Sequence, residues 1–318
     1  MFKMKIFLLV ASALLLMSQT VSATGATSYM SKPTGQYSVG YQDFFVINPT
    51  LCPDKIYQKG TNESSFANAK YCHEMVIRAY YPSSQKVVHG DKYDQTYLQE
   101  FNKLITKYNK LSESEQQLLA TNLAINIYMQ RNLLPIKNKH LPTILFLSGS
   151  GQSSFTYNNI ISDLVSHGYV VIGLNSVFAN GPLQLANGNI VSWLESYNDN
   201  GRLENLADLT FVNDNLQKIF AKSNLNNLID YNNLGLLGHS MGAMNLVDYL
   251  RKQNNPNIKA TILMDPGNML SYYVSQEHKT YIIETPTMPT LLLWSANFRL
   301  NMHESMTLKK SDSEVILS

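Results

Sequence analysis

The chain has 318 residues, of which 44% are hydrophobic and 15% charged, a composition that suits one large globular domain with a sizeable core. It carries 25 basic and 23 acidic residues, and two of the basic ones, Lys3 and Lys5, lie in an amino-terminal segment that we expect to be removed. The remaining chain then has no formal net charge. This excludes an electrostatic basis for binding nucleic acid or an anionic membrane surface.

The amino terminus has the pattern of a secretory signal peptide. A basic region at residues 1–5 precedes an apolar run at 6–17, and a small-residue cleavage site ends at Ala23. The apolar run is shorter than the roughly 20 residues that a membrane span needs, and no later stretch is long enough. We predict a secreted or periplasmic protein, cleaved near Ala23, with a single domain over residues 24–318 and no transmembrane segment in the mature chain.

Cys52 and Cys72 are the two cysteines of the chain. In an oxidising compartment, a disulfide between them would close a loop of about 20 residues and contribute roughly 3 kcal/mol in the loop-entropy model. Two free thiols are the alternative. Together with one nearby histidine, His73, the cysteines are too few ligands for a structural zinc site, so we expect no metal.

The first part of the mature chain contains two predicted strands and then a helical insertion. Residues 39–47 and 72–81 have strand patterns, the second ended by Pro82, and we expect an antiparallel pair at a sheet edge. Residues 94–134 show the helical spacing of apolar side chains. The pattern predicts two helices, and the second continues through Met129. This insertion is expected to cover part of the sheet, and whether it is a lid over an acyl pocket or a docking surface stays open.

From residue 143 onward, predicted strands alternate with predicted helices. The strands lie at residues 143–147, 169–174, 234–237, 260–264, 290–294 and 314–317, and the helices at 157–166, 207–220 and 241–250. Such alternation is typical of a mostly parallel sheet with helices on both faces, so the expected class is α/β.

A Gly-x-Ser-x-Gly motif at residues 238–242 stands between an apolar strand and an apolar-periodic helix, after an Asn-Asn turn signal at 232–233. This context is typical of a nucleophile elbow, in which the serine occupies a sharp strand-to-helix turn with its hydroxyl exposed. We therefore predict Ser240 as a nucleophile. The N–H of Met241, at the start of the following helix, is expected to stabilise an oxyanion.

Two further polar segments follow predicted strands at the edge where α/β sheets bind ligands. A small, glycine-rich loop begins at Ser148, and an N–H near Ser150 is its expected contribution to the oxyanion hole. The loop lacks a complete dinucleotide or phosphate-loop pattern. Asp265 directly follows the strand after the elbow, in the chain order that a triad acid requires, and is predicted to orient a histidine.

The histidine of such a triad is not assigned by the sequence. It usually follows the last strand of this architecture, and residue 318 lies where that strand is predicted to end. One expectation is that the chain is a fragment and that the histidine lies beyond Ser318. The alternative inside the chain is His303.

Several segments are similar to the isoform II branch of the platelet-activating-factor acetylhydrolases and, more distantly, to dienelactone-hydrolase-like esterases. They lie at residues 35–40, 76–82, 143–151, 166–171, 207–212 and 238–242. The resemblance implies an α/β-hydrolase fold with Ser240 as nucleophile and Asp265 as acid. It also implies hydrolysis of carboxylic esters, including short or oxidised acyl esters of phospholipids, and the loop differs from many members in having Ser148-Gly149 for His-Gly.

The sequence therefore predicts a secreted serine esterase that needs no cofactor and acts on a small-molecule or lipid ester through an acyl-enzyme. A peptidase on the same fold is a weaker alternative. A hydrolase-fold binding protein without catalytic activity is the alternative from a different class, because the triad histidine is unassigned.

Overall fold

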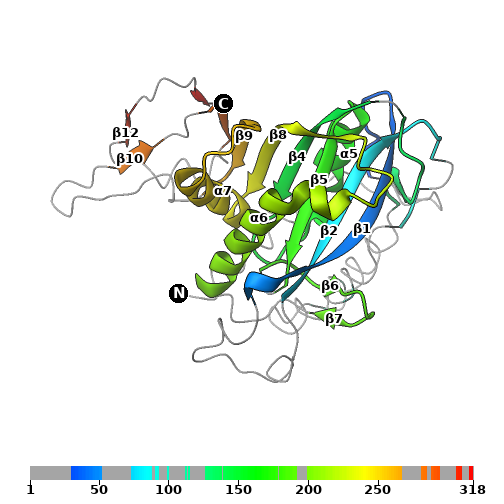
Figure 1. Cartoon of the computed structure of the whole chain (residues 1–318), viewed down its shortest axis with the longest axis horizontal. Helices are drawn as coiled ribbons and strands as arrows, with labels where there is room; N and C mark the ends of the chain where they lie inside the picture. The colour runs from blue at the N-terminus through cyan, green and yellow to red at the C-terminus, as the bar shows by residue number, and fades with distance from the viewer. Residues whose placement is uncertain are drawn as a thin grey trace.

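The computed structural model describes most of the central part of the chain and selected segments around it (Figure 1). The described residues are 30–51, 73–87, 90–92, 99, 112, 114, 126–137, 139–177, 179–191, 199–266, 281–284, 288–293, 306–309 and 315–317. The predicted signal peptide, Cys52 and Cys72 lie outside them.

A nine-stranded sheet forms the centre of the structure, in the spatial order β13-β11-β9-β8-β4-β5-β2-β1-β3. In chain order the strands are β1 (Ser38–Asn48), β2 (His73–Ser83), β3 (Met129–Arg131), β4 (Leu141–Leu147), β5 (Val170–Ser176), β8 (Ile229–His239), β9 (Ile258–Met264), β11 (Thr290–Leu293) and β13 (Val315–Leu317). Only β2 runs antiparallel to its neighbours, β1 and β5. The other pairings are parallel, which confirms the predicted α/β class.

Helices cover both faces of this sheet. The helical elements are η1 (Pro49–Leu51), η2 (Ser154–Tyr157), α5 (Asn158–Ser166), α6 (Asp199–Phe220) and α7 (Met241–Lys252). Two small sheets, β6 (Leu183–Gln184) with β7 (Ile190–Val191) and β10 (Tyr281–Glu284) with β12 (Met306–Lys309), were not expected from the sequence.

Alternating side chains divide the core into two layers, as the period of two in a strand requires. On one face, Ile77 and Leu145 pack with buried residues of α6 and α7. On the other face, Tyr80 and Phe146 pack with α5. Figure 1 shows α6 and α7 on one face of the sheet.

Three local predictions were wrong. The Asn-Asn pair at 232–233 lies inside β8, where a shift in register against β4 absorbs the residues expected to form a turn. β2 continues through Pro82 to Ser83, and the pairing with β1 extends to the same point, with Val39 opposite Pro82 and Ser38 opposite Ser83. Met129, expected in a helix, lies in β3 beside β1, and most of the predicted insertion at 94–134 lies outside the described residues.

In the part of the chain that the structure describes, we find no helix with the length and apolar character needed to cross a lipid bilayer.

A buried ion pair joins β1 and β2. The Nε of Arg78 on β2 donates to Asp43 on β1 at 2.6 Å, and both side chains are more than nine-tenths buried. The guanidinium also lies 3.6 Å from the ring centroid of Phe155 in η2. Burial acts to raise the pKa of Asp43, but the charges and hydrogen bonds of Arg78 and Arg131 outweigh it and hold the pKa below its usual range.

We predict that Asp43→Asn destabilises the fold by about 3–5 kcal/mol, because it leaves the buried Arg78 cation without its carboxylate. The free energy of unfolding measured in urea tests this. Asp163→Asn is the matched control, since its exposed pair with His167 should contribute less than about 1 kcal/mol. Equal losses in the two variants would contradict the prediction.

Candidate active site

Ser240 lies at an abrupt turn between β8 and α7. Its φ of 50° and ψ of −118° lie in a region that residues other than glycine rarely adopt. Its N–H donates to the Met264 carbonyl at 2.8 Å, and its own carbonyl accepts from Met244 at 3.0 Å. Backbone hydrogen bonds on both sides therefore hold this serine in the strained conformation that a nucleophile elbow requires.

Two glycines make this turn sterically possible. A Cβ on Gly242 would lie 2.3 Å from the carbonyl oxygen of Leu147, at the end of β4, and one on Gly238 would lie 2.7 Å from the amide nitrogen of Ala243. Neither position has room for a side chain, and the contacted atoms are backbone. The first turn of α7 therefore packs directly against the end of β4, with Ser240 above the contact.

The three segments predicted to form the site follow three adjacent strands. β8 lies between β4 and β9, with Leu147 opposite Gly238 and His239 opposite Met264. Because these strands are parallel and in register, the loop after β4, Ser240 and Asp265 begin at the same edge of the sheet. The structure thus brings together the segments that hold Ser150, Met241, Ser240 and Asp265.

The loop after β4 has one amide that differs from its neighbours. The N–H of Gly149 donates to the Tyr157 hydroxyl at 3.1 Å, that of Gly151 to the Ala179 carbonyl, and that of Gln152 to the Gly149 carbonyl. The N–H of Ser150 has no partner among the residues that the structure describes. It is therefore available to a ligand, as the prediction for an oxyanion donor requires.

Asp265 is the first residue after β9 and also has a positive φ, of 45°. Its N–H donates to the Leu293 carbonyl at 2.8 Å, which ties it to the end of β11. Asp265 therefore lies at the same edge of the sheet as Ser240. The position is the one that a triad acid occupies in this chain order.

His239 directly precedes Ser240 within the elbow, and its ring packs against the loop after β4. Its Nδ1 lies 2.7 Å from the Tyr157 hydroxyl, which also contacts the side-chain oxygen of Gln152. Burial lowers the pKa of His239, and the charge of Asp265 acts in the opposite direction. The ring is thus a neutral part of the support under the loop.

His303 lies outside the described residues, as does any residue beyond 318. Among the residues that the structure describes, no group of three or more histidine, cysteine, aspartate or glutamate side chains could hold a metal ion.

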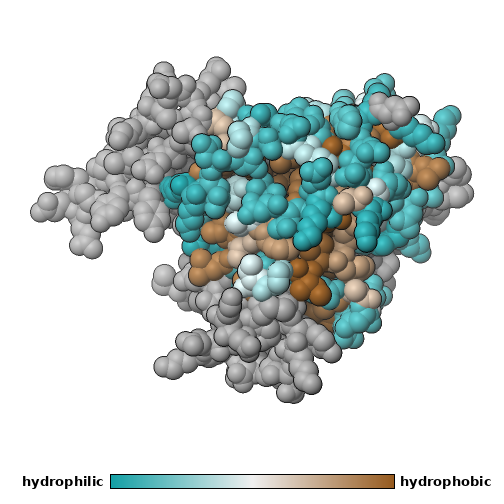
Figure 2. Space-filling view, in the orientation of Figure 1, coloured by the Kyte–Doolittle hydropathy of each residue, from teal (hydrophilic) through white to brown (hydrophobic). Residues whose placement is uncertain are grey.

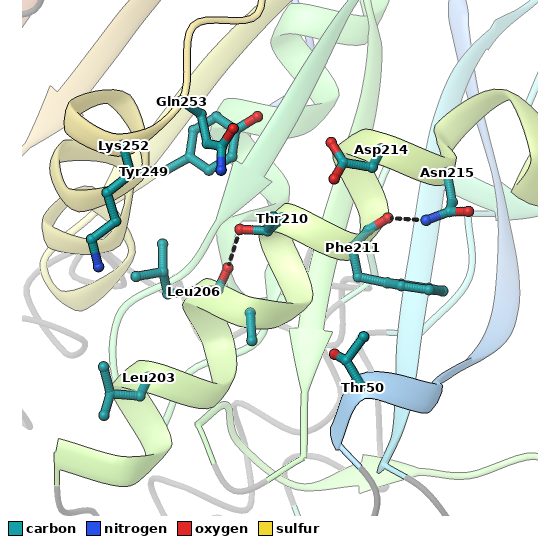
Figure 3. Close-up of a pocket in the computed structure, with 11 residues that line it drawn as sticks. Thr50, Leu203, Leu206, Thr210, Phe211, Asp214, Asn215, Tyr249, Lys252 and Gln253 are labelled. Atoms are coloured by element: carbon teal, nitrogen blue, oxygen red, sulfur yellow. Dashed lines mark hydrogen bonds between the residues drawn. The ribbon is translucent and has the colours of Figure 1, made fainter.

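A cavity of about 590 Å³ lies away from this edge, between α6, α7 and Thr50 (Figure 3). Leu206 and Phe211 line it from α6, and Tyr249 and Lys252 from the end of α7. Hydrophobic residues also gather on this face of the molecule (Figure 2). The helical rise places Lys252 about 16 Å along α7 from its first residue, so the cavity does not contain the elbow.

We predict that His239 makes the fold less stable in acid. Its folded-state pKa lies below the unfolded value of 6.5, so the unfolded chain binds more protons as the pH falls below that value. Stability is then lost progressively toward the lower, folded-state pKa. His239→Asn, which keeps an uncharged polar atom near the Nδ1 position, should weaken this dependence in urea unfolding at pH 5 and pH 8. An identical pH slope in the two proteins would contradict it.

Comparisons with known proteins agree with this geometry. Residues 23–176 match the family described as "Platelet-activating factor acetylhydrolase, isoform II". A solved structure of a ferulic acid esterase from Streptomyces cinnamoneus is similar, with a TM-score of 0.60 and 19% identity over 89% of this chain and 76% of that chain. A search of curated proteins finds no significant match. At that identity the structural likeness shows the fold.

The family match covers the strands and the loop that precede the elbow, and the fold places the elbow beside them. The chain has the α/β-hydrolase fold and, over residues 23–176, resembles the isoform II platelet-activating-factor acetylhydrolases.

Proposed function

We propose that this chain is a secreted serine esterase in which Ser240 is the nucleophile and Asp265 the triad acid. The observation that carries the proposal is the backbone of Ser240, held at a φ of 50° between β8 and α7 at the edge that it shares with Asp265. Strain of this kind persists only where the surrounding structure imposes it, and it is typical of catalytic serines.

In the proposed reaction, the Ser240 hydroxyl attacks the carbonyl carbon of the ester and gives its proton to a histidine. The N–H groups of Met241 and Ser150 stabilise the oxyanion of the tetrahedral intermediate. The intermediate then expels the alcohol, which takes the proton from the histidine, and leaves an acyl group on Ser240. Water, activated by the same histidine, releases the acid and restores the hydroxyl.

We propose a small-molecule or lipid ester as the substrate, with short or oxidised acyl chains on a phospholipid as the class that the family likeness favours. A panel of esters that differ only in acyl length tests this class. Faster hydrolysis of acetyl than of long acyl esters supports it, whereas a preference for long chains or for amide substrates contradicts it.

The proton acceptor is the remaining part of the proposal. The variant His303→Ala shows whether His303 is the group that accepts the proton of Ser240. A loss of hydrolysis equal to that of a Ser240 variant assigns the role to His303, and full activity assigns it to another histidine. The matched control is His140→Ala, because His140 is exposed just before β4, at the opposite end of that strand from the loop.

We predict that Ser240→Ala lowers kcat for ester hydrolysis on the order of 10³-fold or more, because it removes the attacking oxygen. It should also abolish covalent labelling by a fluorophosphonate probe, while the variant remains folded. Ser223→Ala, in the turn after α6, is the control and should leave both unchanged. If the wild-type chain is not labelled, the molecule is a binding protein on a hydrolase fold.

We predict that Asp265→Asn lowers kcat on the order of 10²- to 10⁴-fold, because an amide cannot stabilise the imidazolium or select the correct tautomer. Fluorophosphonate labelling should slow but remain detectable, since Ser240 is still present. Unchanged kcat would remove Asp265 from the triad and leave Ser240 in place.

A further inference from the structure

A chain of buried amides and hydroxyls connects α7 to the loop after β4. Its members come from α7, α6, the end of β5, the segment after β5 and the loop itself. They are Asn245, Asn205, Ser176, Asn180 and Ser148, each at most 1% exposed. Together they pass through the interior beneath the proposed oxyanion site.

The hydrogen bonds of this chain follow one direction. Asn245 donates through Nδ2 to the Oδ1 of Asn205 at 2.7 Å, and Asn205 donates through Nδ2 to the Ser176 hydroxyl at 3.0 Å and to the Oδ1 of Asn180 at 3.5 Å. Asn180 donates through Nδ2 to the Ser148 hydroxyl at 2.8 Å. The direction fixes each amide in one orientation, because reversing any one would place like atoms together.

The last bond of the chain acts on the loop that carries Ser150. The Ser148 hydroxyl donates to the carbonyl of Gln152 at 2.7 Å and so closes the loop on itself. A second contact, from the N–H of Gly151 to the Ala179 carbonyl at 3.1 Å, holds the same loop to the segment that carries Asn180. The position of the Ser150 amide therefore depends on Asn180.

The first member of the chain lies on the helix that carries the other proposed oxyanion donor. Asn245 is about one turn along α7 from Met241. The buried chain thus joins the two elements whose N–H groups must converge on one oxygen atom. An error of about 1 Å in such a geometry can lower the rate on the order of 10²-fold.

We propose that Asn180 and Asn205 are positioning residues, which set the separation of the Ser150 and Met241 amides through Ser148 and Asn245. The inference rests on the proposed function, because it assigns these amides to the oxyanion hole. The residues touch no reacting atom. Their contribution is to transition-state stabilisation, which requires the donors at fixed positions before the reaction begins.

The test compares Asn205→Ala and Asn180→Ala with Asn48→Ala. Asn48 is a suitable control because it is fully buried and donates to Asp208 of the same helix α6 at 2.8 Å, away from the loop. We expect kcat for an acetyl ester to fall about 10- to 100-fold in the first two variants, with KM changed less than about threefold. The control should lose stability in urea and keep its kcat.

Ser148→Ala provides a second measurement if the asparagine variants do not fold, because it removes one hydroxyl. It should lower kcat in the same way, and the double variant with Asn180→Ala should lose no more than the larger single effect. Unchanged kcat, a change confined to KM, or an equal loss in Asn48→Ala overturns the inference while wild-type hydrolysis persists. If the wild-type chain neither hydrolyses the ester nor reacts with the fluorophosphonate, the proposed function fails, and this inference fails with it.

Discussion

The contact between Gly242 and the carbonyl of Leu147 is the constraint on which the site depends. Because Gly242 has no Cβ, the start of α7 can reach the end of β4, where there is no space for a side chain. That approach gives the chain no room to leave β8 gradually, and Ser240 takes a positive φ as the result. Strain of one to a few kcal/mol is stable here because hydrogen bonds and packing on both sides over-determine the turn.

The interior uses neutral and charged polar groups in different places. The buried Arg78–Asp43 pair lies between β1 and β2, away from the elbow, where the guanidinium also packs on Phe155. The buried chain from Asn245 to Ser148 consists of amides and hydroxyls. A neutral chain is buried at a lower cost of desolvation than a charged pair, and within the described residues only the Oδ1 of Asn245 in this chain has no partner. It also adds no fixed charge that would compete with Asp265 for an imidazolium.

The support of the loop after β4 comes from two sides. Tyr157 and His239 hold Gly149 and Gln152 from the α5 face, and Asn180 holds Ser148 from the α6 face. These contacts fix the backbone around Ser150, and within the described residues they leave the N–H of Ser150 without a partner. A loop supported in this way is rigid before substrate arrives, which is the property that electrostatic stabilisation of an oxyanion requires.

Patterns that depend on neighbours along the chain were readable from the sequence alone. The alternation of strands and helices, the glycines around Ser240 and the aspartate after β9 all follow from local spacing, and they predicted the fold and the edge of the sheet where the candidate residues meet. The extent of β8 through residues 232–233 and the place of Met129 in β3 were decided by pairing with distant strands. The buried links from Asn245 to Ser148 likewise join residues up to 40 positions apart, and an isolated asparagine carries no periodic signal. Only tertiary packing removes these amides from water and so makes each of them find a partner.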